Sequence, residues 1–301
     1  MIKTVTRYFI SFAAGLVCCV FAVQANASVS LETTIKAQAD ELDSVAAMLA
    51  GNEGRLLVLD DEKGVLSEYK GKARTSYNLV SKKIFESEDI SGLTRLDEDR
   101  YLLSNIDDSV IAVIDGEANL VQKFGESGSR EGQLDEPSGI DWSHNGRLYV
   151  ADKGNDRISV FGLDGVFIKA IGQLGIAEEH RLQEPEQVFV DLQERIYVLE
   201  KRDDGIVTVF DHDGRVLQRL TSADFDQLAG SDTEIVNITI DNRGLLYAAD
   251  EDNGRIFQID WQDKKLVSSF GSKGDQRGQF EDIRAMVVLA GNKIAVADSQ
   301  N

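Results

Sequence analysis

The chain has 301 residues, of which 52 are acidic and 32 are basic, so its formal net charge is −20. This balance argues against binding to nucleic acid or to an anionic membrane surface, because both need clustered Lys and Arg against phosphate. Apolar residues make up 42% of the chain, which argues against disorder and suits two domains at most, or one large all-β domain.

The first 27 residues are typical of a secretory signal peptide. A basic start with Lys3 and Arg7 leads into an uncharged apolar run over 9–23, and Ala25-Asn26-Ala27 then offers a small-residue cleavage site. Cleavage after Ala27 leaves 30 basic against 52 acidic residues, a net charge of −22. An uncleaved anchor is the weaker alternative, since the run is shorter than the ~20 residues that span a bilayer.

Both cysteines, Cys18 and Cys19, lie inside this apolar run. A lipoprotein signal is therefore a further alternative, although no small residue stands in the right place before either cysteine. A mature chain that begins at Ser28 has no disulfide, thiolate metal site or cysteine nucleophile. We expect a periplasmic or secreted protein that is not inserted in a membrane.

The segment 28–43 has two interpretations. Apolar and polar residues alternate from Val29 to Ile35 as in a strand, and such a strand could close a ring of repeats. Leu31, Ala39 and Leu42 would instead share one helical face with Ile35.

A short pattern recurs along 44–301 at steps of 44 to 50 residues. Its clearest copies are Gly-Arg-Leu-Tyr-Val-Ala-Asp (146–152), Glu-Arg-Ile-Tyr-Val-Leu-Glu (194–200), Gly-Leu-Leu-Tyr-Ala-Ala-Asp (244–250) and Asn-Lys-Ile-Ala-Val-Ala-Asp (292–298). Degenerate copies end at positions 60 and 104. Six copies at a nearly constant step indicate a repeat protein.

The unit at 124–172 shows the plan of each repeat. A glycine-rich loop leads through Pro137 into a first strand, and Asn145-Gly146 predicts a hairpin to a second strand that ends at Ala151. A polar turn, a third strand over 157–161, the hairpin signal Asp164-Gly165 and a fourth strand follow. Four short antiparallel strands in each of about six repeats predict an all-β propeller.

The unit also carries a family resemblance. Phe-Gly…Gly-Gln-Leu…Pro-Ser-Gly-Ile-Asp…Gly-Arg-Leu-Tyr-Val-Ala-Asp…Asn-Asp-Arg-Ile-Ser-Val-Phe closely resembles the NHL repeat, and 270–280 repeats its loop. The resemblance is specific over 124–172, good over 223–298 and weak over 44–123. It implies a six-bladed β-propeller that commonly serves as a binding platform, with some relatives that are lyases or lactonases.

The last copy of the pattern stops at Asp298, where the third strand of a blade should follow. The sequence therefore predicts that the last blade is incomplete in this chain. The chain would then be a fragment of a longer protein with downstream domains, or a divergent open ring.

The turns after the second strands are acidic and would repeat around one face, as in Asp152 to Asp156 and Asp250 to Asp252. An acidic ring could bind a cation or a basic partner. The structural alternative, which we favour, is that Asp152 with Arg157, and Asp250 with Arg255, close their turns as ion pairs. Asp250 and Asp252 are weak candidates for a Ca²⁺ loop.

First strands should line a central channel. Polar residues stand there where apolar ones would favour stability, and these are the candidate ligand-binding residues Ser138, Glu186, Gln187, Asn237 and Arg284. Together they could bind a small anion, a sugar or a peptide. The alternative is that water solvates them in a wet channel.

Catalysis has weaker support in the sequence. His144, His180 and His212 all fall in turns or loops, and no set of zinc ligands is apparent. Lactonase-like propellers hold a divalent ion with channel carboxylates and amides, for which only Glu186 and Asn237 stand out.

We therefore expect an exported, non-catalytic binding module for a protein or small ligand, without a cofactor. A divalent-metal-dependent lactonase- or lyase-like enzyme is the alternative, and a structural or sensor ectodomain is a third possibility.

Overall fold

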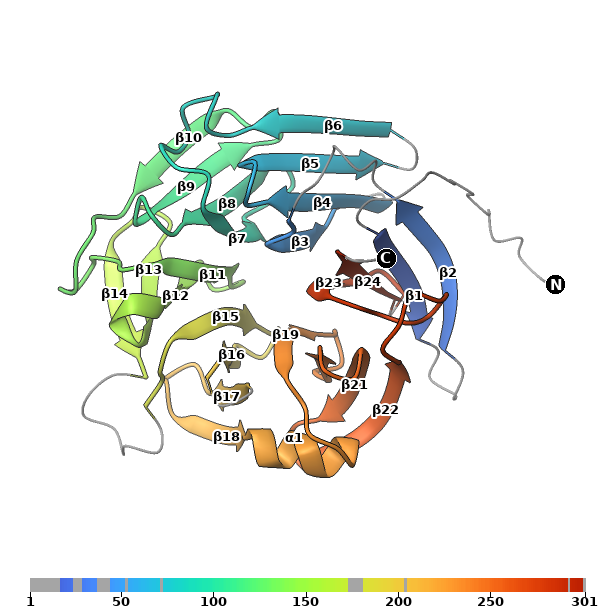
Figure 1. The fold of residues 1–301 in the computed structure, drawn as a ribbon. Helices are drawn as coiled ribbons and strands as arrows, with labels where there is room; N and C mark the ends of the chain where they lie inside the picture. The colour runs from blue at the N-terminus through green and yellow to red at the C-terminus, as the bar shows by residue number, and fades with distance from the viewer. Residues whose placement is uncertain are drawn as a thin grey trace.

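The computed structural model describes residues 17–23, 29–36, 44–51, 54–70, 73–172, 181–202, 205–291 and 293–299. In these ranges every sheet has four antiparallel strands. Figure 1 shows the sheets arranged around a central axis, with one edge strand of each sheet innermost. The chain is therefore an all-β propeller, as the repeat predicts.

Five of the described sheets each use four consecutive strands. The first two comprise β3 (Ala47–Ala50), β4 (Arg55–Asp60), β5 (Val65–Lys70) and β6 (Ala73–Asn78), then β7 (Ile90–Arg95), β8 (Arg100–Asn105), β9 (Val110–Asp115) and β10 (Leu120–Phe124). The third and fourth comprise β11 (Pro137–Trp142), β12 (Arg147–Asp152), β13 (Arg157–Gly162) and β14 (Phe167–Ile171), then β15 (Pro185–Val190), β16 (Ile196–Glu200), β17 (Ile206–Phe210) and β18 (Val216–Leu220). The fifth comprises β19 (Ile235–Ile240), β20 (Leu246–Asp250), β21 (Arg255–Asp260) and β22 (Lys265–Gly271).

A further sheet joins two distant parts of the chain. Its order is β2-β1-β24-β23, built from β1 (Val17–Val23), β2 (Val29–Lys36), β23 (Ile283–Leu289) and β24 (Lys293–Asp298). The expectation of an incomplete last blade is thus corrected, because β1 pairs antiparallel with β24 and takes the third position. Val29–Lys36 forms the strand β2 and not a helix, whereas 37–43 lies outside the described residues.

The strand β1 comes from the apolar run of the predicted signal peptide. The run has the uncharged, apolar composition that suits either a signal peptide or a strand between two others. The other residues of 1–27 lie outside the described ranges, and cleavage after Ala27 stays a prediction.

The hairpins form where glycine follows Asn or Asp. Gly146 and Gly165 have φ angles of +75° and +78°, a region that glycine adopts without the steric cost of a Cβ. Each amide closes its turn, with Gly146 N–H donating to Ser143 O at 3.1 Å. The strand boundaries of 124–172 follow from these turns.

The second strands are among the most buried strands of the described chain. All five residues of β16 are buried, as are the last five of β12. Neighbouring sheets share their apolar clusters, and one cluster joins Tyr149 and Ile158 to Val188 and Phe210 of the next sheet. Because apolar burial is the main favourable term in folding, the contact between sheets stabilises the ring.

Three features depart from a purely repetitive plan. The helix α1 (Ser222–Ala229) stands where other repeats have a glycine-rich loop, and Thr221 and Asp224 form a capping box at its start. In the second repeat Asn105, and not residue 104, ends the second strand, because it pairs with Ile90 as Asp152 pairs with Pro137 in the third repeat. A short 3-10 helix, η2 (Lys153–Asn155), follows β12.

Neither helix of the described chain is long and apolar enough to cross a membrane.

Candidate functional site

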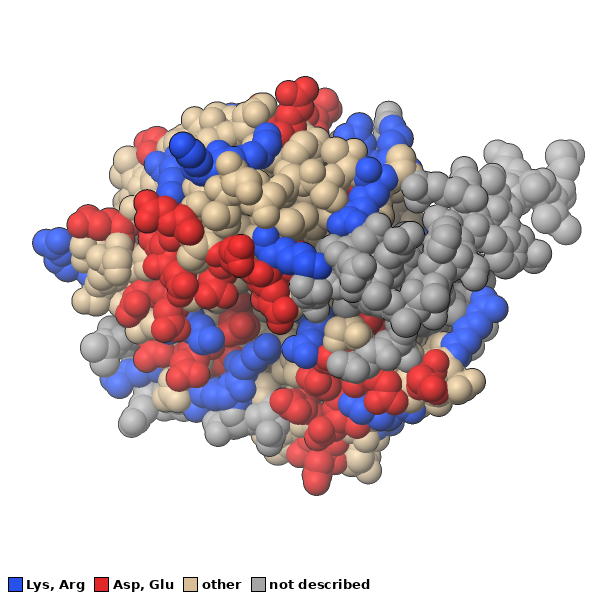
Figure 2. All heavy atoms as spheres, turned by 45° about the horizontal axis from the view of Figure 1, so that its top comes forward, with Lys and Arg blue, Asp and Glu red and all other residues tan. Residues whose placement is uncertain are grey.

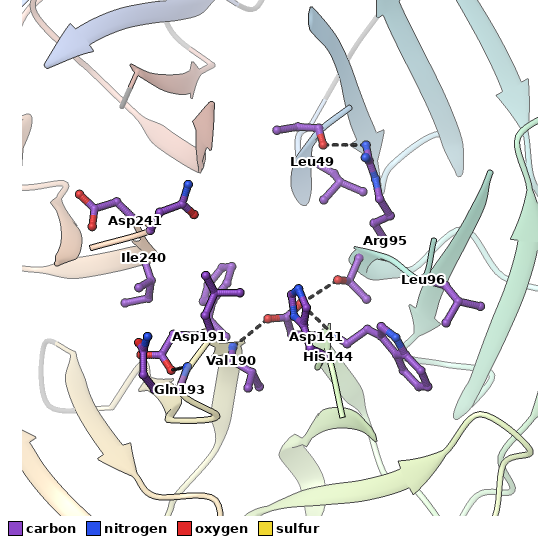
Figure 3. A pocket seen from close by; sticks show the side chains of 16 residues that line it. Leu49, Arg95, Leu96, Asp141, His144, Val190, Asp191, Gln193, Ile240 and Asp241 are labelled. Carbon is purple, nitrogen blue, oxygen red and sulfur yellow. Dashed lines mark hydrogen bonds between the residues drawn. The ribbon is translucent and has the colours of Figure 1, made fainter. Parts of the chain in front are cut away.

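A cavity of about 930 Å³ lies where the carboxyl ends of five inner strands meet. Its walls include the last residues of β3, β7, β11, β15 and β19, together with the hairpin turns that follow three of them. Figure 3 shows these side chains around the opening. Apolar wall residues are Leu49, Leu96, Trp142, Phe189, Val190 and Ile240, and polar ones include Thr94, Arg95, Asp141, His144, Asp191 and Asp241.

Asp141 connects three sheets at the wall of this cavity. Its Oδ1 accepts hydrogen bonds from the Thr94 hydroxyl at 2.7 Å and from its neighbour Trp142 N–H at 2.9 Å, and its Oδ2 accepts one from Val190 N–H at 2.8 Å. Burial raises the pKa of Asp141 to about 6, although these three donors and the charge of His144 oppose the shift. The carboxyl therefore titrates close to neutral pH.

This carboxyl makes stability depend on pH. Its folded-state pKa of about 6 lies above the value of about 3.9 for an unfolded chain, so the native state binds the extra proton between these values. The stability that Asp141 contributes is full below about pH 4 and is lost as the pH rises to about 6, by on the order of 3 kcal/mol. In urea unfolding, we expect wild-type stability relative to Asp141→Asn to fall over this window. A relative gain would contradict the assignment.

Two other carboxylates and one arginine of the cavity wall already have partners. Asp191 Oδ2 lies 2.6 Å from Arg195 Nε, and Asp241 Oδ2 lies 2.6 Å from an Arg243 guanidinium nitrogen. Arg95 donates to Ala50 O at 2.8 Å. The two paired carboxylates thus belong to hairpin turns.

Three of the predicted channel residues connect inner strands near the opposite, amino ends. The Ser138 hydroxyl donates to Pro185 O at 3.1 Å and to Glu186 O at 2.9 Å. Gln187 Oε1 accepts from Ile238 N–H at 2.9 Å, and Asn237 Oδ1 accepts from Met286 N–H at 3.1 Å. These polar side chains therefore bridge neighbouring sheets.

The two charged channel candidates have their own partners. Glu186 pairs with Lys153 at 3.2 Å, and Arg284 pairs with Asp282 at 2.7 Å. None of the five channel candidates lines the 930 Å³ cavity.

The carboxylates and amide that end the second strands are buried. Asp60, Asn105, Asp152, Glu200, Asp250 and Asp298 each have 0% exposure, so they cannot form an exposed acidic ring. Each accepts hydrogen bonds from loops, as Asp298 does from the N–H groups of Glu281 and Asp282. Figure 2 shows other acidic side chains gathered across the middle of one face, with Lys and Arg between them.

The two predicted turn pairs differ. Asp152 lies 2.6 Å from Arg157 Nε, and both side chains are almost fully buried. Arg255 instead donates to the Ser231 hydroxyl at 3.0 Å and lies over the Phe257 ring. Asp250 accepts from the side-chain amide of Asn253 at 2.8 Å.

The candidate Ca²⁺ loop uses its oxygens internally. Asp250 Oδ1 faces the N–H groups of Glu234 and Asn253, and Asp252 lies exposed on the surface. Over the described residues, no three His, Cys, Asp or Glu side chains are grouped so that they could hold a metal ion.

The histidines are dispersed. His144 is exposed at the rim of the cavity, whereas His212 lies in the β17–β18 hairpin. His180 lies outside the described residues.

Sequence reasoning missed the cavity and its carboxylate. One signal was available, because Asp141 stands in a predicted strand where an apolar or small residue is usual. Its role depends on Thr94 and Val190, which are 47 and 49 residues away, and only the closed ring brings them to it.

No family model matches the chain. Among curated proteins, the chain is 26% identical to protein brain tumor of Drosophila melanogaster over 149 residues, which cover 50% of this chain and 14% of that protein. Two matches of 45 residues, each covering 15% of this chain, are 51% identical to ncl-1 and 47% identical to lin-41 of Caenorhabditis elegans and cover 5% and 4% of those proteins. All three are NHL-repeat proteins. The chain spans no more than 14% of the length of these relatives.

Solved β-propellers share the fold. A catalytically inactive virginiamycin B lyase from Staphylococcus aureus, crystallised with quinupristin, aligns with a TM-score of 0.60 at 13% identity over 85% of this chain and 78% of its own. A chain of a nidogen/laminin complex aligns with a TM-score of 0.59 at 13% identity over 84% of this chain and 93% of its own. At this identity the likeness concerns the fold alone.

Proposed function

We propose that the chain is an NHL-type, non-catalytic binding module whose sheets act as the blades of one propeller. Its ligand, a small molecule or a peptide segment, occupies the 930 Å³ cavity at the carboxyl ends of the inner strands. The observation that carries the proposal is the composition of this cavity, with aromatic and aliphatic walls and a few fixed polar groups. Ligand sites in proteins commonly combine these features.

The similarity to NHL-repeat proteins supports a binding role. The chain has exposed loops on both faces of the ring, and such loops carry binding surfaces in many scaffolds. A protein partner that docks on the loops and inserts a side chain into the cavity would use both the loops and the cavity.

The cavity contains a natural reporter for a test. The sequence has two tryptophans, and Trp142 lines the cavity while Trp261 is buried against Tyr197 elsewhere. In a Trp261→Phe variant, small aromatic fragments should change the Trp142 fluorescence saturably. Fragments that bind only at the outer strands, as located by crystallography, would contradict the proposal.

One observation favours the enzyme alternative. Asp141 and His144 line the same cavity, and a carboxyl with a pKa of about 6 suits a general acid or base. Among the described residues no three His, Cys, Asp or Glu side chains are grouped so that they could hold a metal ion, and we derive no step through a metal. The test is to assay the chain against a panel of lactones with Mg²⁺ present. Hydrolysis by the wild-type chain that is lost in Asp141→Asn would favour the enzyme alternative.

We also propose export, on the strength of the N-terminal pattern. Cleavage after Ala27 and the strand β1 exclude one another in a mature protein, since cleavage removes Val17–Val23 and uncovers the edge of β24. Mass spectrometry of the protein from a Gram-negative host should find a periplasmic chain that begins at Ser28. An intact Met1 in the cytoplasmic fraction would contradict export.

A further inference from the structure

Asp141 is a carboxylate whose hydrogen-bond donors are all electrically neutral. They are one hydroxyl and two backbone amides, and no salt bridge joins Asp141 to a cation of the described chain. Asp141 is half-buried in the cavity wall, and a carboxylate that loses part of its water without gaining a cation is destabilised. Each carboxylate oxygen has two lone pairs, so Oδ2, which accepts one hydrogen bond, has room for another donor.

The other carboxylates of the cavity differ in this respect. Asp191 and Asp241 each hold the arginine of their own hairpin at 2.6 Å. Figure 3 shows Arg95 extending toward β3 and away from Asp141. His144 lies beside Asp141, but it is exposed at the rim.

The walls next to Asp141 suit a cation with an apolar body. Trp142 and Phe189 line the same cavity and present aromatic rings, whose faces attract cations. Leu49 and Ile240 provide apolar surface on other sides. The net charge of −20 also raises the concentration of cations near the protein.

We propose that the cavity binds an organic ammonium compound, whose cationic group lies against the Asp141 carboxylate and whose apolar body lies against Trp142 and Phe189. The inference rests on the proposed function, because it names the ligand class of the same cavity. The ammonium group would donate a charge-assisted hydrogen bond to Oδ2 and so give Asp141 a cationic partner.

Three probes with one ring and different charges test this inference. Benzylammonium, benzyl alcohol and benzoate are titrated near neutral pH into the full Trp261→Phe chain, with Trp142 fluorescence and calorimetry as readouts. We expect benzylammonium to bind about tenfold more tightly than benzyl alcohol. Asp141→Asn should reduce this preference to about threefold or less. Asp213→Asn, which removes the same charge from a side chain 60% exposed in a distant hairpin, should preserve it.

A second measurement uses the wild-type chain, so it does not require a variant to fold. Carboxyl-detected NMR of the wild-type chain follows the titration of Asp141 with and without benzylammonium. A bound cation favours the charged carboxylate, so the pKa of Asp141 should move down toward its ordinary value. An unchanged pKa at saturation would overturn the inference.

The outcomes separate the inference from the proposed function. Equal binding of benzyl alcohol and benzylammonium would overturn the ammonium class and leave the cavity as a ligand site. Preference for benzoate would overturn it in favour of an anion at Arg95. Failure of all three probes to bind the folded chain would contradict both the inference and the use of the cavity.

Discussion

Replacing Asp152 by Ala is expected to lower the free energy of unfolding by about 3–5 kcal/mol, because it leaves the Arg157 guanidinium buried without its carboxylate. Asp152 also accepts hydrogen bonds from Asp135 N–H and the Ser159 hydroxyl, both at 2.8 Å. Arg157 in turn donates to Gln133 O at 2.7 Å and to Arg130 O at 3.0 Å. The pair therefore attaches the loop before β11 to the turn after β12. Urea unfolding followed by circular dichroism measures the loss.

The exposed pair Asp97–Arg100 provides the matched control. Its atoms also lie 2.6 Å apart, but the two side chains are 42% and 40% exposed. Water and ions screen such a pair, so Arg100→Ala should cost only about 0–1 kcal/mol. If both substitutions gave the same small loss, the buried pair would not hold the loop. Protease cleavage within 125–134 should also accelerate in Asp152→Ala and stay unchanged in Arg100→Ala.

The local pattern of the sequence predicts the blades well. Asn145-Gly146 and Asp164-Gly165 determine the turns, and the short apolar runs between them mark the two buried strands β12 and β13. The same reasoning identifies Asp152 and Arg157 as partners because they are five residues apart on one turn. It fails for Asp250 and Arg255 at the same spacing, since Ser231 offers the second arginine another acceptor.

Contacts between blades are harder to predict. The polar residues Gln187 and Asn237 are conspicuous in inner strands, but their acceptor atoms meet backbone amides about 50 residues away. A sequence shows that such a residue is polar and does not show which neighbour it reaches. The cavity was missed for the same reason, because its wall combines five inner strands.

The sheet that contains β1 shows a different limit of prediction from sequence. An uncharged apolar run has the composition of a signal peptide and also of a strand that pairs on both sides, as β1 does with β2 and β24. Composition alone does not separate the two. Determining the mature N terminus does.

Gly139→Ala is expected to cost about 1–3 kcal/mol by forcing two inner strands apart. A Cβ at this position would lie 2.7 Å from Glu186 O and 2.8 Å from Gln187 Cα, both backbone atoms of β15. Glycine thus lets β11 approach β15 closely, whereas Gln187 spans the next gap with a long side chain. Urea unfolding measures the loss. Gly162→Ala is the control, since the close contact of its Cβ would be with the end of the exposed Asp164 side chain and not with backbone, and it should cost less than about 1 kcal/mol.

Gly139→Ala should also affect the cavity, because Asp141 of β11 accepts a hydrogen bond from Val190 N–H of β15 at 2.8 Å. Moving the two strands apart weakens this hydrogen bond to the charged carboxylate, so the pKa of Asp141 should rise further above its ordinary value. Carboxyl-detected NMR of Gly139→Ala and Gly162→Ala tests this, with a rise expected only in the first. An unchanged pKa in a destabilised Gly139→Ala chain would show that the amino and carboxyl ends of the inner strands respond independently, and that the glycine controls stability alone.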